Sequence, residues 1–429
     1  MSELQPSDRR PGLSRRAFVQ GTALAGIAAF LAACTGTKSS AAPSASSAAA
    51  ASAGPSTSSA APSAAASAAP SYTPTPKNIT GPLKFANWPG YIDQVTAADT
   101  TTGVLPPGSS KSLVDFEKKY SVKVDYVEKI DDNQSFYETI RPALAGGLPT
   151  GWDLIVLTDW LAAKIITKGW AEHVDAENVP NCVKNLRDPL RNQTWDPNND
   201  FHFPWQSGMT GIGVNTKTLA ANKIPEPTKL SDLWTIPSDK TTFLTESRDT
   251  FGLGLLKLGI VPDPAKVTDA DLQAVADDIQ PLVDKGLRFT GNEYLQDFGQ
   301  KKVWAAFVWS GDLASSGGED DKFAFPEEGT MIWTDNMMIP KGAANKYTAE
   351  LMMNYVYDPV VAAQIADYVN YVTPVKGADT AIKAIDPGAE SNPLIFPPAD
   401  VVAKAHNFQF LSDELEVKMN ALFAKLSGN

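Results

Sequence analysis

The chain has 429 residues, 43% of them hydrophobic and 20% charged, and is long enough for two domains with separate cores. Its net charge of −12 argues against a nucleic-acid partner, which requires a basic face, and favours a cationic ligand over an anionic one. Two cysteines and three histidines, with no HxxxH spacing, are too few for a disulfide framework or for a thiolate or imidazole metal site. We therefore expect no metal and no cofactor.

The N-terminus has the pattern of an export signal. Residues 14–19 (Ser-Arg-Arg-Ala-Phe-Val) resemble the twin-arginine signal, and the apolar stretch 21–33 that follows is too short to span a bilayer stably. It ends in Leu-Ala-Ala-Cys, which resembles the lipobox of bacterial lipoproteins. We predict that 1–33 is a signal peptide and that Cys34 carries the lipid that anchors the protein to the outer face of the cell membrane.

A tether is predicted to separate this anchor from the folded part. Residues 34–78 are almost wholly Ala, Ser, Pro and Thr, without the apolar periodicity that a packed core requires, so we expect disorder. The folded part is expected to begin near Gly81, and the Thr-, Gly-, Pro- and Ser-rich segment 96–112 is expected to be a surface loop.

From Gly81 onward, strand-like and helical patterns alternate, which predicts an α/β fold with a largely parallel sheet. The first block contains strands 83–86, 122–127 and 152–157 and helices 113–120, 136–144 and 160–168. The second block contains strands 203–214, 241–245 and 303–309, two strands within 323–340, and helices 250–258, 269–285, 349–369 and 413–426.

Tryptophans and carboxylates recur where the predicted strands end. Ligands of open α/β sheets bind at the carboxyl ends of strands, and aromatic faces with carboxylates suit an organic ammonium. Alternatives remain for each residue: a tryptophan at such a place more often packs in the core, and the acidic residues could serve helix starts or turns. The residues with this pattern are Trp88, Trp160, Glu246, Asp249, Trp309, Asp312, Trp333 and Asp335.

From Gly81 to Asn429 the chain resembles the spermidine/putrescine-binding proteins of bacterial ABC importers. The resemblance rests on segments in a fixed order: 85–92 (Phe-Ala-Asn-Trp-Pro-Gly-Tyr-Ile), 152–156, 196–200, 211–215, 231–234, 332–340 and 371–374. It implies a two-lobed periplasmic-binding-protein fold of type II, with a ligand cleft between lobes. We expect lobe 1 to comprise 79–211 and 334–376, and lobe 2 to comprise 212–333 and 377–429.

The resemblance also implies which residues contact a polyamine. They are Trp88, Tyr91, Thr158, Trp160, Glu246, Asp249, Trp309, Asp312, Trp333, Asp335, Tyr371 and Gln409. Asp312 with Asp335 is expected at one end of the ligand and Glu246 at the other. Pro89 departs from the family's usual Ser or Thr, and Asp159 has no assigned role and is expected to face solvent.

These observations predict an extracytoplasmic monomer that binds a polyamine by lobe closure and delivers it to the permease of an ABC importer. Alternatives are a binding protein of the same fold for thiamine, an iron complex, a sugar or an anion, for which only Arg248 offers a cation at the strand ends. A secreted hydrolase with Glu246 and Asp335 as an acid pair is a third alternative. Because the chain has no GxSxG motif and no zinc-type spacing, we predict no enzymatic activity.

Overall fold

The computed structural model describes residues 74–95, 105–106 and 108–428. The predicted signal peptide (1–33), Cys34 and most of the predicted tether lie outside the described residues, as does much of the 96–112 segment. In the described part of the chain, no helix is both long enough and apolar enough to cross a membrane.

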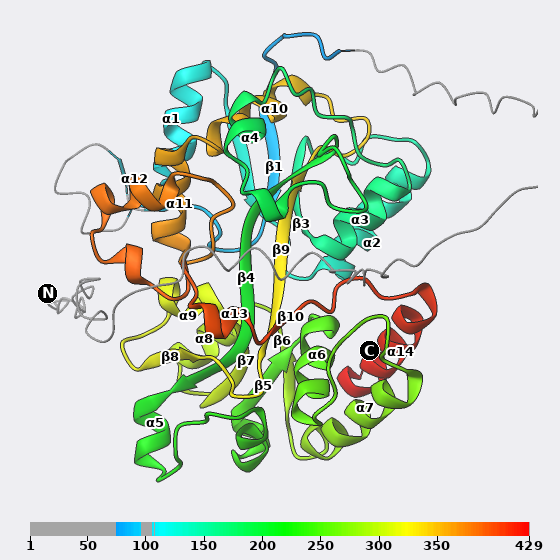
Figure 1. The fold of residues 1–429 in the computed structure, drawn as a ribbon, viewed down its shortest axis with the longest axis vertical. Helices are drawn as coiled ribbons and strands as arrows, with labels where there is room; N and C mark the ends of the chain where they lie inside the picture. The colour runs from blue at the N-terminus through cyan, green and yellow to red at the C-terminus, as the bar shows by residue number, and fades with distance from the viewer. Residues whose placement is uncertain (1–73, 96–104, 107, 429) are drawn as a thin grey trace, which may run out of the picture.

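Two lobes lie one above the other and are joined by long strands that run through both (Figure 1). The first lobe contains parallel strands β1 (Leu83–Asn87), β2 (Val124–Glu128) and β3 (Leu154–Thr158), and the second contains parallel strands β5 (Thr241–Leu244), β6 (Arg288–Thr290) and β7 (Ala305–Trp309). Crossover strands β4 (His202–Asn215) and β9 (Thr330–Met338) lie between these sets; they are antiparallel to each other, β9 is antiparallel to β3, and β4 is antiparallel to β7. The predicted two-lobed α/β fold is therefore confirmed.

The strand order across the sheet is β2-β1-β3-β9-β4-β7-β5-β6. Short strands β8 (Asp321–Ala324) and β10 (Ala405–His406) pair with β4 and β9. Every residue of β3, β4, β7 and β9 is buried, because helices cover the faces of both halves of the sheet. This burial explains why the parallel strands β3 and β7 are nearly continuous apolar runs, whereas β4 and β9 also carry polar residues.

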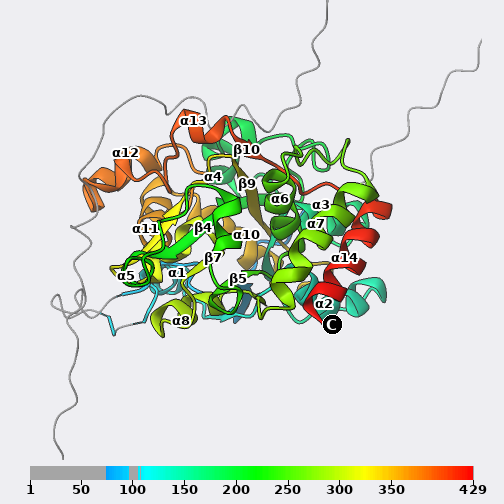
Figure 2. The ribbon, with the colours of Figure 1, turned by 90° about the horizontal axis from the view of Figure 1, so that it is seen from below.

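Helices surround each lobe (Figures 1 and 2). The first lobe carries α1 (Lys111–Tyr120), α2 (Asn133–Ala145), α3 (Asp159–Thr167), α4 (Pro180–Asn185), α10 (Lys346–Val356), α11 (Pro359–Val369) and α12 (Ala378–Ile385). The second lobe carries α5 (Thr216–Ala221), α6 (Ser247–Lys257), α7 (Asp269–Val283), α8 (Glu293–Gly299), α9 (Ser310–Ser316) and α14 (Asp413–Ser427), and α13 (Ala399–Val402) precedes β10.

The segment 349–369, predicted as one helix, is instead two. Helix α10 ends at Val356, and α11 begins at Pro359 with Asp358 as its N-cap, whose side chain accepts a hydrogen bond from the backbone amide of Val360. Proline cannot continue a preceding helix but suits the first turn of a new one, which explains the break.

The lobe boundary near residue 376 also differs from the expected one. Helix α12 packs against α11 of the first lobe, so the chain does not enter the second lobe at 377. It returns there through β10, which pairs with β9 at Thr330 and Met331. The last residues of the predicted tether lie against the first lobe too, since the Thr75 amide donates to Asp175 over 2.8 Å.

Candidate functional site

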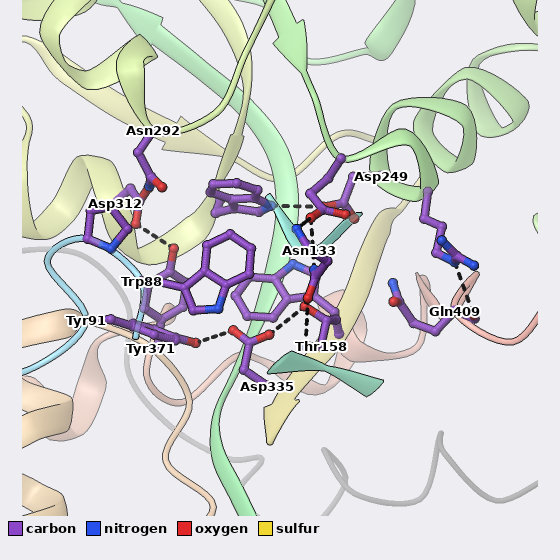
Figure 3. Close-up of a pocket in the computed structure, with 15 residues that line it drawn as sticks. Trp88, Tyr91, Asn133, Thr158, Asp249, Asn292, Asp312, Asp335, Tyr371 and Gln409 are labelled. Carbon is purple, nitrogen blue, oxygen red and sulfur yellow. Dashed lines mark hydrogen bonds between the residues drawn. The ribbon is translucent and has the colours of Figure 1, made fainter. Parts of the chain in front are cut away.

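A cavity lies between the lobes, where the strands of each lobe end; its empty space of about 470 Å³ includes a part that is open to solvent. Every residue predicted to contact the ligand lines this cavity except Trp160. The lining also includes Pro89, Asn133, Arg248 and Asn292. Figure 3 shows most of these side chains converging on one space, with carboxylates on several sides of the aromatic rings.

The fold brings these residues together because parallel strands end at the same edge of their sheet. Trp88 and Tyr91 follow β1, Thr158 ends β3, and Trp309 ends β7. In the second lobe, β5 leads through Glu246 into the first turn of α6. The carboxyl ends of both sets of strands thus face the same cavity, as expected for ligand sites in open α/β sheets.

Asp335, on crossover strand β9, is held by donors of the first lobe. The Tyr91 hydroxyl donates to its Oδ2 over 2.9 Å, and the Thr158 hydroxyl donates to its Oδ1 over 2.7 Å. Burial raises the pKa of Asp335 to about 7, against the opposing effect of these hydrogen bonds. A nearby cation would favour the ionised form of this carboxyl group.

Asp312 has a separate set of partners. Its Oδ1 accepts from the Tyr371 hydroxyl over 2.7 Å, and its Oδ2 accepts from the Asn292 side-chain amide over 2.7 Å and from the Tyr294 hydroxyl. Burial raises its pKa as well. Tyr91 and Tyr371, which hold Asp335 and Asp312, are in edge-to-face contact with ring centroids 5.2 Å apart.

Glu246 and Asp249 contribute a second-lobe pair of carboxylates. The Trp309 indole donates to Asp249 over 2.9 Å, and Asn133 of the first lobe donates to Glu246. Burial raises the pKa of Asp249 to about 6 and raises that of Glu246 as well. Nearby, the side-chain oxygen of Gln409 is buried without a hydrogen-bond partner among the described residues, so it is free to accept from a ligand.

Aromatic rings form the walls between these carboxylates. Trp88 of the first lobe meets Trp309 of the second edge-to-face, with centroids 5.9 Å apart. Trp333 lies 5.5 Å from Tyr371, and a Cβ on Gly208 would approach the Trp333 ring to 2.5 Å. Glycine at this position of β4 is therefore what allows the indole to lie so close to the strand.

Trp160 does not line the cavity, in contrast to the prediction. Its ring instead stacks on the guanidinium of Arg248, which lies 3.7 Å from the ring centroid. Arg248 does line the cavity, but its Nη2 is paired with Glu416 over 3.2 Å and its Nε donates to the Gln409 carbonyl. Among the described residues of the lining, Arg248 is the only cationic side chain and is thus already paired, while the same lining has four carboxylates.

The expectation that Asp159 faces solvent is wrong: its side chain is buried at the start of α3. Its carboxylate accepts hydrogen bonds from the Thr334 amide over 3.2 Å and from the Asn336 side chain over 2.9 Å, both on β9. Burial raises its pKa to about 7. Asp159 therefore holds crossover strand β9 through Thr334 and Asn336, the two residues that flank Asp335.

Sequence reasoning missed Asn133 and Asn292 as lining residues. Asn133 follows the N-cap Asp132 at the start of α2, and Asn292 precedes α8. Both look like ordinary polar residues of helix starts, and only the tertiary arrangement brings them to the cavity. Among the described residues, no group of histidine, cysteine and acidic side chains is placed to hold a metal ion.

Two lobes joined by crossover strands, with a polar and aromatic cavity between them, define a type II solute-binding protein. The chain belongs to the bacterial extracellular solute-binding protein family, whose sequence pattern matches residues 111–397.

Individual relatives agree with this assignment. The chain is 30% identical over 341 residues to the putrescine-binding periplasmic protein PotF of Escherichia coli, and 27% identical over 326 residues to the spermidine/putrescine-binding periplasmic protein of Salmonella typhimurium. Each comparison covers 75% of this chain and 85% of the relative. These relatives are named as binding proteins rather than enzymes.

Solved structures share the fold. The spermidine/putrescine ABC transporter substrate-binding protein PotD of Streptococcus pneumoniae superposes with a TM-score of 0.61 at 22% identity, covering 81% of this chain and 98% of that one. The TpPotD lipoprotein of Treponema pallidum gives 0.62 at 19% identity, with 81% and 99% covered.

Proposed function

We propose that this protein is an extracytoplasmic lipoprotein that binds a polyamine of the putrescine or spermidine type between its lobes and delivers it to an ABC importer. The observation that carries this proposal is the group of four buried carboxylates between aromatic walls in one inter-lobe cavity. Burying that much negative charge is costly unless cations pair with it. A short molecule with ammonium groups and methylenes supplies both the charges and an apolar body for the indole faces.

The geometry suggests where the ammonium groups bind. Figure 3 shows Asp312 and Asp249 on opposite sides of the Trp88 ring. Hydrogen bonds connect Asp335 through Thr158 and Asn133 to Glu246. We therefore group Asp335 with Asp249 and Glu246, whereas the sequence analysis expected it at the same end of the ligand as Asp312. We place one ammonium at Asp312 and another among Asp249, Asp335 and Glu246.

Lobe closure is the proposed coupling between binding and transport. The carboxylates come from both lobes and from β9, so a polyamine contacts both lobes only when they are closed. Its differential affinity then stabilises the closed state, which is the form that docks on the permease. A neutral sugar lacks the charge that would offset the burial of these carboxylates.

The proposal is tested by calorimetric titration of the protein after unfolding and refolding, which removes any ligand retained during purification. The ligands are putrescine, spermidine, agmatine, thiamine and a neutral sugar. Saturable one-to-one binding of a polyamine is expected, without heat from the sugar. Binding of thiamine or the sugar in preference to every polyamine would overturn the assignment of the ligand.

The lipid anchor is tested separately. We propose that Cys34 carries a diacylglycerol and that cells expressing Cys34→Ser release the protein from the membrane fraction. The measurement is the partition of the protein between membranes and the soluble fraction, with metabolic labelling by a fatty acid. Unchanged membrane association and unchanged labelling of the Cys34→Ser variant would contradict this part of the proposal.

A further inference from the structure

A cluster at the edge of the cavity, of which only Arg248 reaches the lining, joins the lobes on the side of α3 and α14. Lys164 of α3 donates from Nζ to Oε1 of Glu416 on α14 over 2.6 Å, and Oε2 of the same carboxylate pairs with Arg248 of α6 over 3.2 Å. Arg248 in turn stacks on the Trp160 ring of α3. We call these four residues the α3–α14 latch.

The latch crosses between the lobes. Helix α3 packs on β3 and β9 in the first lobe, whereas α14 packs on α6 and α7 in the second, where Phe423 contacts Phe289 of β6. Figures 1 and 2 both show α3 and α14 on the same side of the molecule. Any opening of the cleft on this side separates Lys164 from Glu416 and Trp160 from Arg248.

We infer that the α3–α14 latch sets how long the lobes stay closed on a bound ligand, and that Lys164 and Glu416 are positioning residues that tune release without contacting the ligand. This inference rests on the proposed function, because it concerns closure around the same cavity. The latch is only partly accessible to water: the side-chain exposure is 25% for Lys164, 12% for Glu416 and 4% for Arg248. Pairs shielded to this degree are screened less than surface pairs, so their loss affects dissociation measurably.

Glu416 has a second effect on the cavity. Arg248 lines the cavity and interacts electrostatically with Glu246 and Asp249, so an uncompensated guanidinium there would compete with an ammonium group for the same carboxylates. Glu416 neutralises this charge from outside the cavity. The structure therefore explains why a cation-binding cavity tolerates an arginine in its lining.

The chain offers a matched control within one lobe. Lys257 donates to Asp278 over 2.6 Å and lies 4.5 Å from the ring centroid of Trp234, with a side-chain exposure of 15%. Lys164 likewise combines an ion pair, with Glu416, and an indole ring, that of Trp160 at 5.6 Å, but the partners of Lys257 all belong to the second lobe. Lys257→Met removes a comparable ion pair without touching the contact between lobes.

The experiment measures dissociation of putrescine and spermidine by stopped-flow fluorescence from the full chain carrying Cys34→Ser. Lys164→Met is expected to raise the dissociation rate about fivefold or more, and Lys257→Met to leave it within twofold of the wild-type value. Glu416→Gln should raise the dissociation rate at least as much as Lys164→Met does. In the double variant the increase should be smaller than the product of the two separate increases, since both substitutions remove the same ion pair. Lys164→Met decides the outcome, because Glu416→Gln also removes a partner of the buried Arg248.

A second readout does not depend on a ligand. Dyes on Leu148→Cys and Val261→Cys, exposed positions of the first and second lobe, report the lobe separation by energy transfer, while native Cys182 is buried. Lys164→Met is expected to shift the distribution toward open lobes and Lys257→Met to leave it unchanged. If Lys164→Met and Lys257→Met behave identically in both measurements, the inference that the α3–α14 latch controls closure is overturned. If the parent protein binds no polyamine, the proposed function fails, and the energy-transfer result alone decides the latch.

Discussion

Asn133 of the first lobe donates two hydrogen bonds to one carboxylate oxygen of Glu246 in the second lobe, from its backbone amide over 2.8 Å and from its side-chain amide over 2.9 Å. Because Asn133 is the first residue of α2, this backbone amide also belongs to the positive end of the helix dipole. The same side chain donates to the Thr158 hydroxyl over 2.8 Å, and Thr158 donates to Asp335. Glu246 therefore joins the two lobes as well as supplying negative charge to the cavity.

Removing the side chain of Asn133 should weaken ligand binding. Asn133→Ala takes away one donor to Glu246 and the donor that orients Thr158, and we expect about a tenfold loss of affinity, mainly through faster dissociation. The measurement is calorimetry combined with stopped-flow kinetics. The neighbouring Gln134→Ala serves as the control, because Gln134 is only half-buried, lies outside the cavity lining and donates its side-chain hydrogen bond within α2, to Glu138. Equal affinity of the two variants would show that the contact between Asn133 and Glu246 has no part in closure.

Asp335 should be indispensable for binding an amine. Asp335→Ala removes a carboxylate held by Tyr91 and Thr158 in the cavity, and we expect the affinity measured by calorimetry to fall by about 2–5 kcal/mol, roughly 30- to 4,000-fold in Kd. The fold should persist, which circular dichroism and thermal melting would confirm. Asp93→Asn is the comparison, since Asp93 is a buried carboxylate of the same lobe, bonded to Ser112 and outside the cavity. Retained affinity in Asp335→Ala would exclude Asp335 from the site.

Much of the site follows from local sequence, because a strand that ends in a tryptophan or a carboxylate puts that residue at the sheet edge wherever the strand lies. Trp88 and Trp309 were predictable for this reason, whereas Asp335 lies inside β9 and was expected from the family resemblance of the segment 332–340. Trp160 was not, because it lies one residue inside α3, where the start of the helix turns its ring toward Arg248 instead of the cavity. Only the packing of α3 against the second lobe determines that direction.

Contacts between distant parts of the chain were the features that sequence could not supply. Asn133 and Glu246 are 113 residues apart, and neither has a local pattern that points to the other. The position of α12 against α11 likewise depends on tertiary packing. No local sequence pattern indicates this packing, so the lobe boundary was expected at 376. Asp159 appeared free because nothing near it in sequence could pair with it, whereas its partners on β9 are about 175 residues away.

Ligand affinity should depend on pH through the cavity carboxylates. Burial raises the pKa of Asp335 from 3.8 to about 7 and that of Asp249 to about 6 in the unliganded protein. An ammonium favours the ionised forms, so binding releases protons below pH 7, and affinity should rise with pH until both groups are ionised, near pH 8. We expect binding at pH 5.5 to be at least about tenfold weaker than at pH 8. Calorimetry at pH 6 in two buffers with different ionisation enthalpies would measure the release directly, and proton uptake on binding would contradict the prediction.

Asp159 should make the folded protein less stable as pH rises. Burial raises its pKa from 3.8 to about 7, so between these values the folded state keeps a proton that the unfolded chain has lost, and the free energy of unfolding falls with increasing pH. Asp159→Asn removes this ionisation and keeps an acceptor for the Thr334 amide, while the Asn336 side-chain amide can turn its oxygen toward the new amide group. At pH 8 we expect the free energy of unfolding of the variant to exceed that of the parent protein by about 2 kcal/mol or more, and its melting temperature to be higher. At pH 4 the two proteins should differ little. Asp196 gives the opposite sign: burial raises its pKa, but the hydrogen bond and charge of His202, together with backbone hydrogen bonds from Phe201 and Asp200, outweigh burial and lower it, so Asp196→Asn should lose stability at pH 8. Equal destabilisation of Asp159→Asn at both pH values would show that its hydrogen bonds to β9 matter more than the cost of burying its charge.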